Sequence, residues 1–252
     1  MNLEGKSSLV TGAARRIGRA IALALAAEGA NVVVHYGDSE REALALCDEI
    51  ERRGARASAL KANLDDPVEL EGLIGRAAQA FGPLDVLVNN ASVFPADTVA
   101  TIDLQSLRQN MEVNAWAPFA LSRAFREQTA RGRIVNLLDT RISGYDRAHV
   151  GYILSKHVLT VLTRMTALEF APEVTVNAVA PGLILPPPGE GEEFLERIKE
   201  TLPLQRIGEP SEVADAVLFL AKSDFITGQI VYVDGGRHLR ERIELSDGQD
   251  LH

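Results

Sequence analysis

Short apolar runs rich in β-branched residues alternate along the chain with longer segments in which apolar residues recur every three or four positions. The short runs predict seven strands, at 8–11, 31–35, 56–61, 84–88, 133–138, 174–179 and 230–233. The longer segments predict helices at 17–27, 39–53, 68–81, 104–114, 118–130, 152–170 and 211–221. This alternation is typical of βαβ units, in which helices cover both faces of a parallel sheet.

The strand-like runs also indicate how deeply the sheet is buried. Val32, Val33 and Val34 form one continuous apolar run, as expected for a strand covered on both faces. No linker interrupts the alternation, so we predict a single α/β domain over residues 1–239, built on a parallel sheet of about seven strands. The charged segment 240–252 is predicted to be a C-terminal tail, either frayed or packed on a neighbouring subunit.

Composition narrows the class of protein. The 252 residues carry 26 Lys and Arg against 35 Asp and Glu, a formal net charge of −9, which argues against a nucleic-acid partner. The single cysteine, Cys47, excludes an internal disulfide framework and a cysteine-rich zinc site. The longest apolar stretch, 20–27, is too short to cross a membrane, and the histidines lack metal-ligand spacing. We therefore expect a cytoplasmic protein without a membrane segment or a bound metal.

A glycine-containing turn follows the first predicted strand. Residues 11–18 read TGAARRIG and lead directly into the first predicted helix. Such a turn directs backbone N–H groups and the helix dipole at an anion, with Gly12 making the turn and Gly18 allowing close packing. After the fourth strand, the side chains of Asn89 and Asn90 could brace the central strands beside a bound nucleotide. Together these features indicate a dinucleotide site.

The end of the second predicted strand bears on which dinucleotide is bound. An acidic residue there usually holds the ribose hydroxyls of NAD, but this sequence has Tyr36. Arg15 and Ser39 could contact a 2′-phosphate, whereas Asp38 would repel it. We predict NADPH rather than NADH.

Tyr152 and Lys156 stand four residues apart in a predicted helix, so their side chains share one face. A lysine cation beside a phenol favours the phenolate, which should lower the tyrosine pKa from its reference value of about 10. Tyr152 is therefore a candidate proton donor near neutral pH.

These features share the order and spacing of a known family: the turn at 11–18, Asn89-Asn90-Ala91, Asn114, Tyr152 with Lys156, Pro181-Gly182 and Asp234-Gly235-Gly236. Over residues 5–239 the chain resembles the short-chain dehydrogenase/reductase family. The resemblance implies a Rossmann-type doubly wound fold, a nicotinamide cofactor and a homotetramer. It also implies that Tyr152 donates the proton, that Lys156 binds the nicotinamide ribose, and that Asn114 holds a water in the proton relay.

The chain departs from the family at its catalytic serine, which should lie thirteen residues before the tyrosine. Asp139 occupies that position. A carboxylate would repel the alkoxide formed in carbonyl reduction, but it can accept a hydrogen bond from the N–H formed when C=N is reduced. Asp139 therefore favours an imine-like substrate, or else it marks an inactive member of the family. Arg16 replaces the middle glycine of the turn and could contact both phosphate and an acceptor-rich heterocycle.

Both departures occur in one branch of the family, the pteridine and dihydromonapterin reductases, which this chain also resembles at residues 89–94 and 234–239. The branch implies that a pterin lies between the nicotinamide and the ring of Phe94. It further implies that Asp139 and Tyr152 deliver the proton. Residues 183–193 are predicted to cover the substrate or to form an inert surface loop.

The predicted site has three parts. The catalytic residues are Asp139, Tyr152, Lys156 and Asn114. The cofactor-binding residues are Gly12, Arg15, Arg16, Ile17, Gly18, His35, Tyr36, Ser39, Asn63, Leu64, Asn90, Ala91, Ser92, Tyr152, Lys156, Pro181 and Gly182. The substrate-binding residues are Arg16, Ser92, Phe94, Asp139, Tyr152 and Leu183.

We predict an NADPH-dependent reductase of a pterin or folate-like heterocycle, a small-molecule substrate. Two alternatives stay open. One is a carbonyl reductase of the same family, acting on a 3-oxoacyl compound or a sugar. The other is a non-catalytic dinucleotide-binding module that senses redox state.

Overall fold

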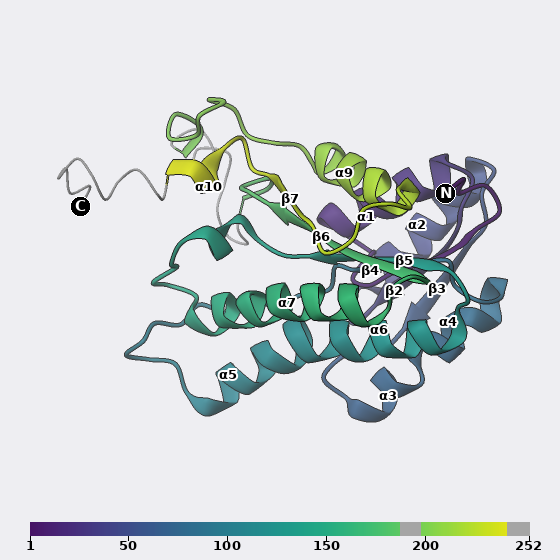
Figure 1. The fold of residues 1–252 in the computed structure, drawn as a ribbon, viewed down its shortest axis with the longest axis horizontal. Coiled ribbons are helices and arrows are strands. Elements are labelled where there is room, and N and C mark those ends of the chain that lie inside the picture. The colour runs from purple at the N-terminus through teal and green to yellow at the C-terminus, as the bar shows by residue number, and fades with distance from the viewer. Residues whose placement is uncertain (187–197, 241–252) are drawn as a thin grey trace.

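A seven-stranded parallel sheet forms the centre of the computed structural model, which describes residues 1–186 and 198–240 (Figure 1). The strand order is β3-β2-β1-β4-β5-β6-β7, so the chain moves outward from β1 to one edge and then from β4 to the other. The strands are β1 (Ser7–Val10), β2 (Asn31–Tyr36), β3 (Ala57–Lys61), β4 (Val86–Asn89), β5 (Gly132–Leu137), β6 (Val174–Pro181) and β7 (Ile230–Val233). The predicted doubly wound Rossmann-type sheet is confirmed.

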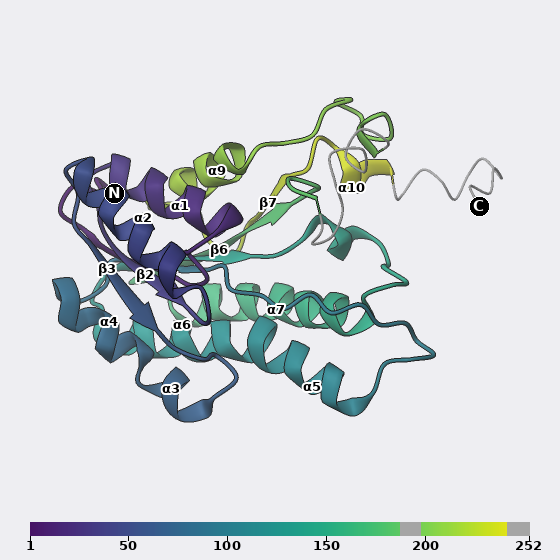
Figure 2. The ribbon, with the colours of Figure 1, turned by 180° about the vertical axis from the view of Figure 1, so that it is seen from behind.

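Helices cover both faces of this sheet (Figures 1 and 2). One layer holds α1 (Arg16–Ala27), α2 (Glu40–Arg52) and α9 (Pro210–Lys222); the other holds α4 (Leu73–Phe81), α6 (Ala117–Gln128) and α7 (Val150–Glu169). Neighbouring strand residues serve opposite layers: Val10 packs with the first layer, whereas Leu9 packs with the second. Both positions are fully buried, which explains why the strands read as continuous apolar runs.

The structure divides the predicted helix 68–81 in two. Helix α3 (Pro67–Glu71) ends at Gly72, and α4 begins at the next residue. The Asp66 carboxylate accepts hydrogen bonds from two backbone N–H groups at the start of α3 and so caps it. The prediction of one helix was wrong because glycine is a poor helix former and the short α3 has a cap of its own.

The two helices predicted at 104–114 and 118–130 form one continuous rod instead. Helix α5 (Leu104–Met111) passes through a π-helical turn, η1 (Glu112–Trp116), into α6. Pro118 stands at the start of α6, and its ring nitrogen has no hydrogen to donate to the preceding turn. The widened turn carries the helix past this proline and places Asn114 in its middle.

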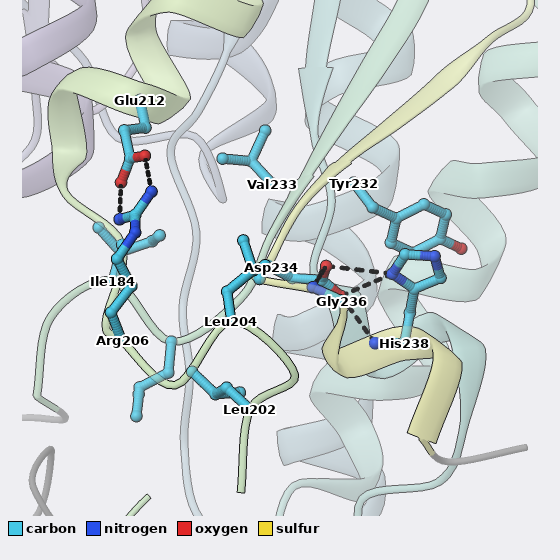
Figure 3. A pocket seen from close by; sticks show the side chains of 13 residues that line it. Ile184, Leu202, Leu204, Arg206, Glu212, Tyr232, Val233, Asp234, Gly236 and His238 are labelled. Carbon is cyan, nitrogen blue, oxygen red and sulfur yellow. Dashed lines mark hydrogen bonds and ion pairs between the residues drawn. The ribbon is translucent and has the colours of Figure 1, made fainter. Parts of the chain in front are cut away.

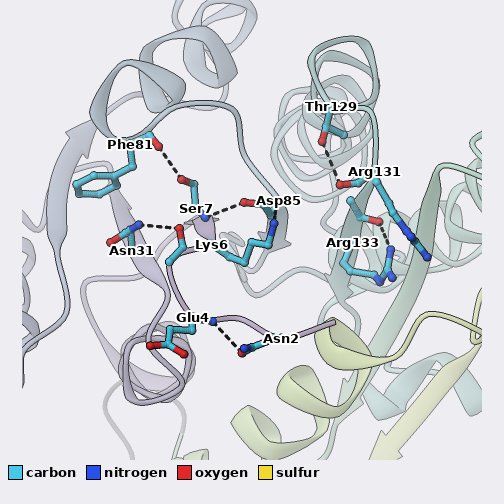
Figure 4. A network of polar contacts seen from close by, with 12 residues as sticks. Asn2, Glu4, Lys6, Ser7, Asn31, Phe81, Asp85, Thr129, Arg131 and Arg133 are labelled. Atoms are coloured by element: carbon cyan, nitrogen blue, oxygen red, sulfur yellow. Dashed lines mark hydrogen bonds and ion pairs between the residues drawn. The ribbon is translucent and has the colours of Figure 1, made fainter.

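Polar contacts secure the amino ends of the strands, away from the site described below (Figure 4). The Asp85 carboxylate accepts a hydrogen bond from the Ser7 backbone N–H at 2.9 Å and pairs with Lys6 Nζ at 3.0 Å. Arg133 is buried and donates to the backbone carbonyls of Ser223 and Gly132. Contacts between the protein's own residues thus occupy this edge of the sheet, and the cavity described below lies at the carboxyl edge.

The last described element is α10 (Arg237–Arg240), so the predicted tail lies outside the described residues except for Arg240. Residues 187–193 of the predicted loop also lie outside them. Among the described helices, none combines the length and apolarity that a membrane span requires.

Candidate active site

A cavity of about 920 Å³ opens at the carboxyl edge of the sheet, where β1 and β4 lead the chain in opposite directions. It runs from the glycine turn and the end of β2, past the loops that follow β4 and β5, to the start of α7. Of the predicted site residues, those that line it are Gly12, Arg15, Arg16, Ile17, Gly18, His35, Tyr36, Ser39, Asn63, Leu64, Asn90, Ala91, Ser92, Phe94, Asp139, Tyr152, Gly182 and Leu183. Asn114, Lys156 and Pro181 lie behind this wall.

The glycine turn leaves no room for a side chain at position 18. A Cβ at Gly18 would overlap the carbonyl oxygen of Gly12 and lie 2.5 Å from Asn90 Nδ2. The Asn90 amide donates to the carbonyls of Thr11 and Gly12, at 2.9 and 3.0 Å, which ties the turn to the end of β4. Helix α1 starts here without a side-chain cap and without an acidic residue in its first turn. Its N-terminal N–H groups can therefore bind the phosphates of a dinucleotide, and the turn fits such a cofactor.

His35 supports the turn from within the core. Its side chain is 2% exposed, Nδ1 accepts a hydrogen bond from the Gly12 N–H at 3.1 Å, and Nε2 lies 3.1 Å from the carbonyl of Ala62. Since Nε2 faces an acceptor, it carries the proton and Nδ1 is free to accept. Burial lowers the pKa of His35 to about 4, so the ring is neutral at physiological pH. His35 acts on the cofactor turn through Gly12.

Arg16 has φ +55°, a left-handed conformation that an L-residue rarely adopts, in the place where the family has glycine. Its Nη2 donates to the carbonyl of Pro186 at 3.0 Å. Arg16 therefore spans from the cofactor turn to the segment after β6.

At the end of β2, Tyr36 is buried and its hydroxyl donates to Glu40 at 3.2 Å. The Glu40 carboxylate therefore takes the one hydrogen that the Tyr36 hydroxyl can donate. Arg15, Asp38 and Ser39 line the adjoining part of the cavity, so the charges expected to favour and to oppose a 2′-phosphate lie along one wall.

Asp139 and Tyr152 form a hydrogen-bonded pair. Asp139 stands just beyond β5, where Oδ1 accepts the Arg141 backbone N–H at 2.8 Å. Its Oδ2 accepts the Tyr152 hydroxyl at 2.9 Å. Burial, together with the charge of Asp139, raises the pKa of Tyr152 well above its usual value, so the phenol keeps its proton.

The predicted lowering of the Tyr152 pKa was wrong. Lys156 Nζ lies 5.5 Å from the centre of the Tyr152 ring and donates to the backbone carbonyl of Leu137 at 2.8 Å. Burial lowers the pKa of Lys156 to about 8, although the charge of Asp139 opposes the shift. Burial is the main cause of the raised Tyr152 pKa, and the Asp139 carboxylate, which is hydrogen-bonded to the phenol as the lysine is not, adds to it.

The side-chain amide of Asn114 is fully occupied by protein partners. Its Nδ2 donates to the carbonyl of Val93 and to Ser155 Oγ, and its Oδ1 accepts from the Val93 N–H and from Ser92 Oγ. An amide offers two donor hydrogens and two acceptor lone pairs, and these partners use all four. In this structure Asn114 holds the loop that carries Ser92 and Phe94.

Phe94 lines the cavity beside the Asp139–Tyr152 pair. Its ring meets the Tyr152 ring edge-on, with 4.6 Å between ring centres. It is stacked on His149 at 3.9 Å, and the guanidinium of Arg141 lies 4.9 Å from its centre. The sequence analysis overlooked Arg141 and His149, because neither belongs to a motif and only the fold brings them to Phe94.

A second, smaller cavity of about 310 Å³ adjoins the first and shares Leu183 and Ile184 with it (Figure 3). In it, the Asp234 carboxylate accepts from His238 and from the Gly236 N–H, and also from the hydroxyl of Thr140. Thr140 directly follows Asp139, so Asp234 anchors the chain next to the Asp139–Tyr152 pair. In residues 1–186 and 198–240, no three His, Cys, Asp or Glu side chains form a metal-binding group.

The fold and the site together define a class of protein. A phosphate-binding glycine turn and a buried tyrosine–lysine helix face one crevice of a doubly wound sheet, as in nicotinamide-dependent oxidoreductases. The predicted family assignment can now be tested against known proteins.

Residues 12–238 match the family model described as enoyl-(acyl carrier protein) reductase. The 3-oxoacyl-[acyl-carrier-protein] reductase FabG of Staphylococcus aureus is 36% identical over 242 residues, which cover 93% of this chain and 98% of that protein. The chain belongs to the short-chain dehydrogenase/reductase family, as predicted.

Two solved structures are similar over almost the whole chain. Both are FolM alternative dihydrofolate reductase 1 in complex with NADP, from Brucella canis and Brucella suis, each with a TM-score of 0.90 and 36% identity. The first covers 94% of this chain and 96% of its own, and the second covers 95% and 97%. The nicotinamide dinucleotide predicted as cofactor is confirmed by the family and by these NADP-bound neighbours.

Proposed function

We propose that this chain is an NADPH-dependent reductase of a dihydropterin or dihydrofolate-type heterocycle. The observation that carries the proposal is the hydrogen bond from the Tyr152 hydroxyl to Asp139 Oδ2, at 2.9 Å, on the wall of the cofactor cavity. The FolM neighbours support this reading, and the FabG relatives support carbonyl reduction at the same identity of 36%. Overall similarity therefore does not separate the two, and the proposal rests on the chemistry of Asp139.

An acidic partner fits the product of C=N reduction. When bound, NADPH supplies a hydride to the carbon of the reacting bond. The nitrogen then takes a proton, and the resulting N–H is a donor that a carboxylate can accept. A reduced carbonyl instead passes through negatively charged oxygen, which the Asp139 carboxylate would repel.

The proton comes from Tyr152. The raised pKa keeps the phenol protonated, and in this structure Asp139 accepts its single hydrogen and so orients the hydroxyl. When the substrate nitrogen replaces Asp139 as the acceptor, that hydrogen passes to the nitrogen, and Asp139 is free to accept the new N–H. Lys156 is fixed by the carbonyl of Leu137 beneath the pair, where it would bind the nicotinamide ribose. Asn114 holds the loop of Ser92 and Phe94, on which the flat substrate would stack.

For the cofactor, Arg15 and Ser39 stand at the wall where a 2′-phosphate would bind, together with Asp38. The Arg15 guanidinium and the Ser39 hydroxyl can both donate hydrogen bonds to a phosphate, whereas Asp38 contributes only repulsion. We therefore propose NADPH as the preferred reductant.

Steady-state kinetics test the proposal. Dihydrobiopterin, dihydromonapterin, dihydrofolate and a 3-oxoacyl thioester are each offered with NADPH and with NADH. We expect turnover of at least one dihydropterin or dihydrofolate, with a higher kcat/KM for NADPH. Turnover of the thioester alone would support the carbonyl reductase, and tight NADPH binding without any turnover would support the redox sensor.

We further propose a homotetramer built through α7. Five large apolar side chains on this helix are 40–83% exposed: Leu154, Val158, Val161, Met165 and Leu168. Their spacing of three or four residues places them in one stripe, which a neighbouring subunit could cover. Light scattering coupled to gel filtration tests the assembly, and Val161→Glu should dissociate it.

We propose the cytoplasm as the location. Cys47 is the single cysteine, it is buried, and burial raises its pKa to about 11. Such a thiol is unreactive and needs no oxidising compartment. Fractionation of cells producing a tagged full-length chain tests this location.

A further inference from the structure

Phe94 is the aromatic wall of the cavity, and its ring is stacked on another side chain of this chain. The imidazole of His149 lies 3.9 Å from the Phe94 ring, centre to centre, with 15° between the two planes. Phe94 lines the cavity whereas His149 does not. His149 therefore supports the ring from outside the substrate space.

Asp146 fixes His149 in this stack. The carboxylate Oδ2 of Asp146 lies 3.0 Å from His149 Nδ1 and 3.1 Å from Arg141 Nε. Burial acts to raise the pKa of Asp146, but the Ala148 N–H, Arg141 and His149 outweigh it and lower the pKa. Asp146 is thus an anion at neutral pH, and His149 Nδ1 is the donor that faces it. One carboxylate therefore holds two of the groups that contact the Phe94 ring.

Backbone hydrogen bonds join the segment that carries Phe94 to the segment that carries His149. Residues 97 and 149 form a parallel bridge, in which Asp97 N donates to Ala148 O at 2.9 Å. The Asp97 carboxylate accepts the Gly151 N–H at 3.0 Å, at the start of α7. These hydrogen bonds therefore connect the Phe94 loop and the His149 turn to the helix that carries Tyr152.

The Phe94 ring is also perpendicular to the Tyr152 ring, at 86° and 4.6 Å. A flat substrate that stacks on Phe94 would present its edge toward the Tyr152 hydroxyl and Asp139. The angle of Phe94 thus sets the height at which the reacting nitrogen meets the proton donor. His149 is stacked on the Phe94 ring and opposes its rotation, together with the Tyr152 edge contact and Arg141.

We infer that His149 is a positioning residue, which sets Phe94 as a rigid stacking surface for a flat heterocyclic substrate. The inference rests on the proposed function and adds a determinant of substrate class to it. Flexible 3-oxoacyl substrates gain little from a fixed aromatic plane, whereas a planar ring gains a preorganised contact.

The test compares His149→Ala, His149→Phe and Asp146→Asn with the full-length wild type. His157→Ala is the matched control, because His157 lies on α7 and is only partly buried. The substrates are dihydrobiopterin and a 3-oxoacyl thioester. Dissociation constants for NADPH and melting temperatures report on the cofactor site and on folding.

We expect His149→Ala to raise KM for dihydrobiopterin about fivefold and to change kcat less than about twofold. His149→Phe should restore KM, since it keeps the stacked ring, and Asp146→Asn should fall between them. His157→Ala, thioester turnover and NADPH affinity should stay at wild-type values. A general loss of folding would affect all of these readouts together.

Two outcomes overturn the inference alone: wild-type KM in His149→Ala, or a loss confined to kcat that His149→Phe does not restore. Failure of the wild type to reduce any dihydropterin or dihydrofolate overturns the proposed function, and this inference with it.

Discussion

The two ends of the cavity are built from different materials. At the cofactor end, the glycine turn is held by backbone groups and neutral side chains, namely the Asn90 amide and a histidine that burial keeps uncharged. At the substrate end, Asp139 accepts the Tyr152 hydroxyl, and Asp146 pairs with Arg141. The turn is backbone packed against the ends of β1 and β4, whereas the substrate end consists of side chains on the loops after β4 and β5 and on α7.

This difference separates what is shared from what is particular. A turn made of backbone has little freedom to change, because any Cβ at Gly18 collides with other backbone. Side chains on loops can be exchanged without altering the sheet. The same cofactor end can thus serve reductases of different substrates, and we propose that the residue at position 139 determines which bond is reduced.

The largest effect is expected at the substrate end, from Tyr152→Phe. The variant removes the only hydroxyl hydrogen-bonded to Asp139 in the described structure, and kcat should fall about 10²- to 10⁴-fold. The dissociation constant of NADPH should change little, since the glycine turn is untouched. Single-turnover kinetics and cofactor fluorescence measure the two. Equal losses in kcat and in NADPH affinity would mean that the substrate end and the cofactor end do not act independently.

At the cofactor end, His35 should make stability depend on pH. Its pKa is 6.5 in the unfolded chain and about 4 in the fold, so the unfolded state binds the proton first. The stabilisation is complete above pH 6.5 and is lost progressively as the pH falls toward 4, by about 3 kcal/mol in all. Urea unfolding of the wild type and of His35→Gln, from pH 7 to 4.5, measures the difference. Parallel pH profiles would contradict it.

Gly18→Ala tests the backbone turn directly. The added methyl group meets the Gly12 carbonyl and the Asn90 amide, so we expect a loss of about 1–3 kcal/mol in stability and weaker NADPH binding. Gly75 is the control, since it lies in α4 with nothing within 4 Å of an added Cβ. Gly75→Ala should stabilise the protein by about 0.5–1 kcal/mol. If Gly18→Ala and Gly75→Ala changed stability in the same way, close packing would not explain the glycine at position 18.

Arg16 joins the two ends, and its removal should have the smallest effect. Arg16→Gly relieves a left-handed conformation worth about 1–2 kcal/mol and loses the bond to Pro186. KM for the dihydropterin should rise more than KM for NADPH. Gln205→Gly, at the other left-handed non-glycine residue, should relieve strain without changing either KM. If Arg16→Gly raised the two KM values equally, the role of Arg16 would be limited to contacting the cofactor phosphate.

The sheet was predictable because its strands are apolar on both faces and each is followed by a helical pattern. Errors arose where local signals compete. Gly72 divides a helix that periodicity alone extends, and the π turn at 112–116 carries a helix past Pro118. Periodicity reports the buried face of a segment and not its backbone geometry, so neither feature was visible in it.

At the site, the residues carried by motifs line one cavity, because strand ends of a parallel sheet meet at the same edge. The Tyr152 pKa was not predictable from its spacing to Lys156. Burial of the phenol raises this pKa first, and the fold also brings the Asp139 carboxylate to the hydroxyl from 13 residues away. Likewise, only tertiary structure brings His149 to Phe94.

The central claim is that the Asp139 carboxylate, paired with Tyr152, suits this site to C=N reduction. The most direct test is kcat/KM for dihydrobiopterin and for a 3-oxoacyl thioester, in the wild type and in Asp139→Ser. The account predicts that Asp139→Ser lowers the value for dihydrobiopterin at least about tenfold and leaves that for the thioester unchanged or higher. An unchanged rate with dihydrobiopterin, or the same fall with both substrates, would contradict it.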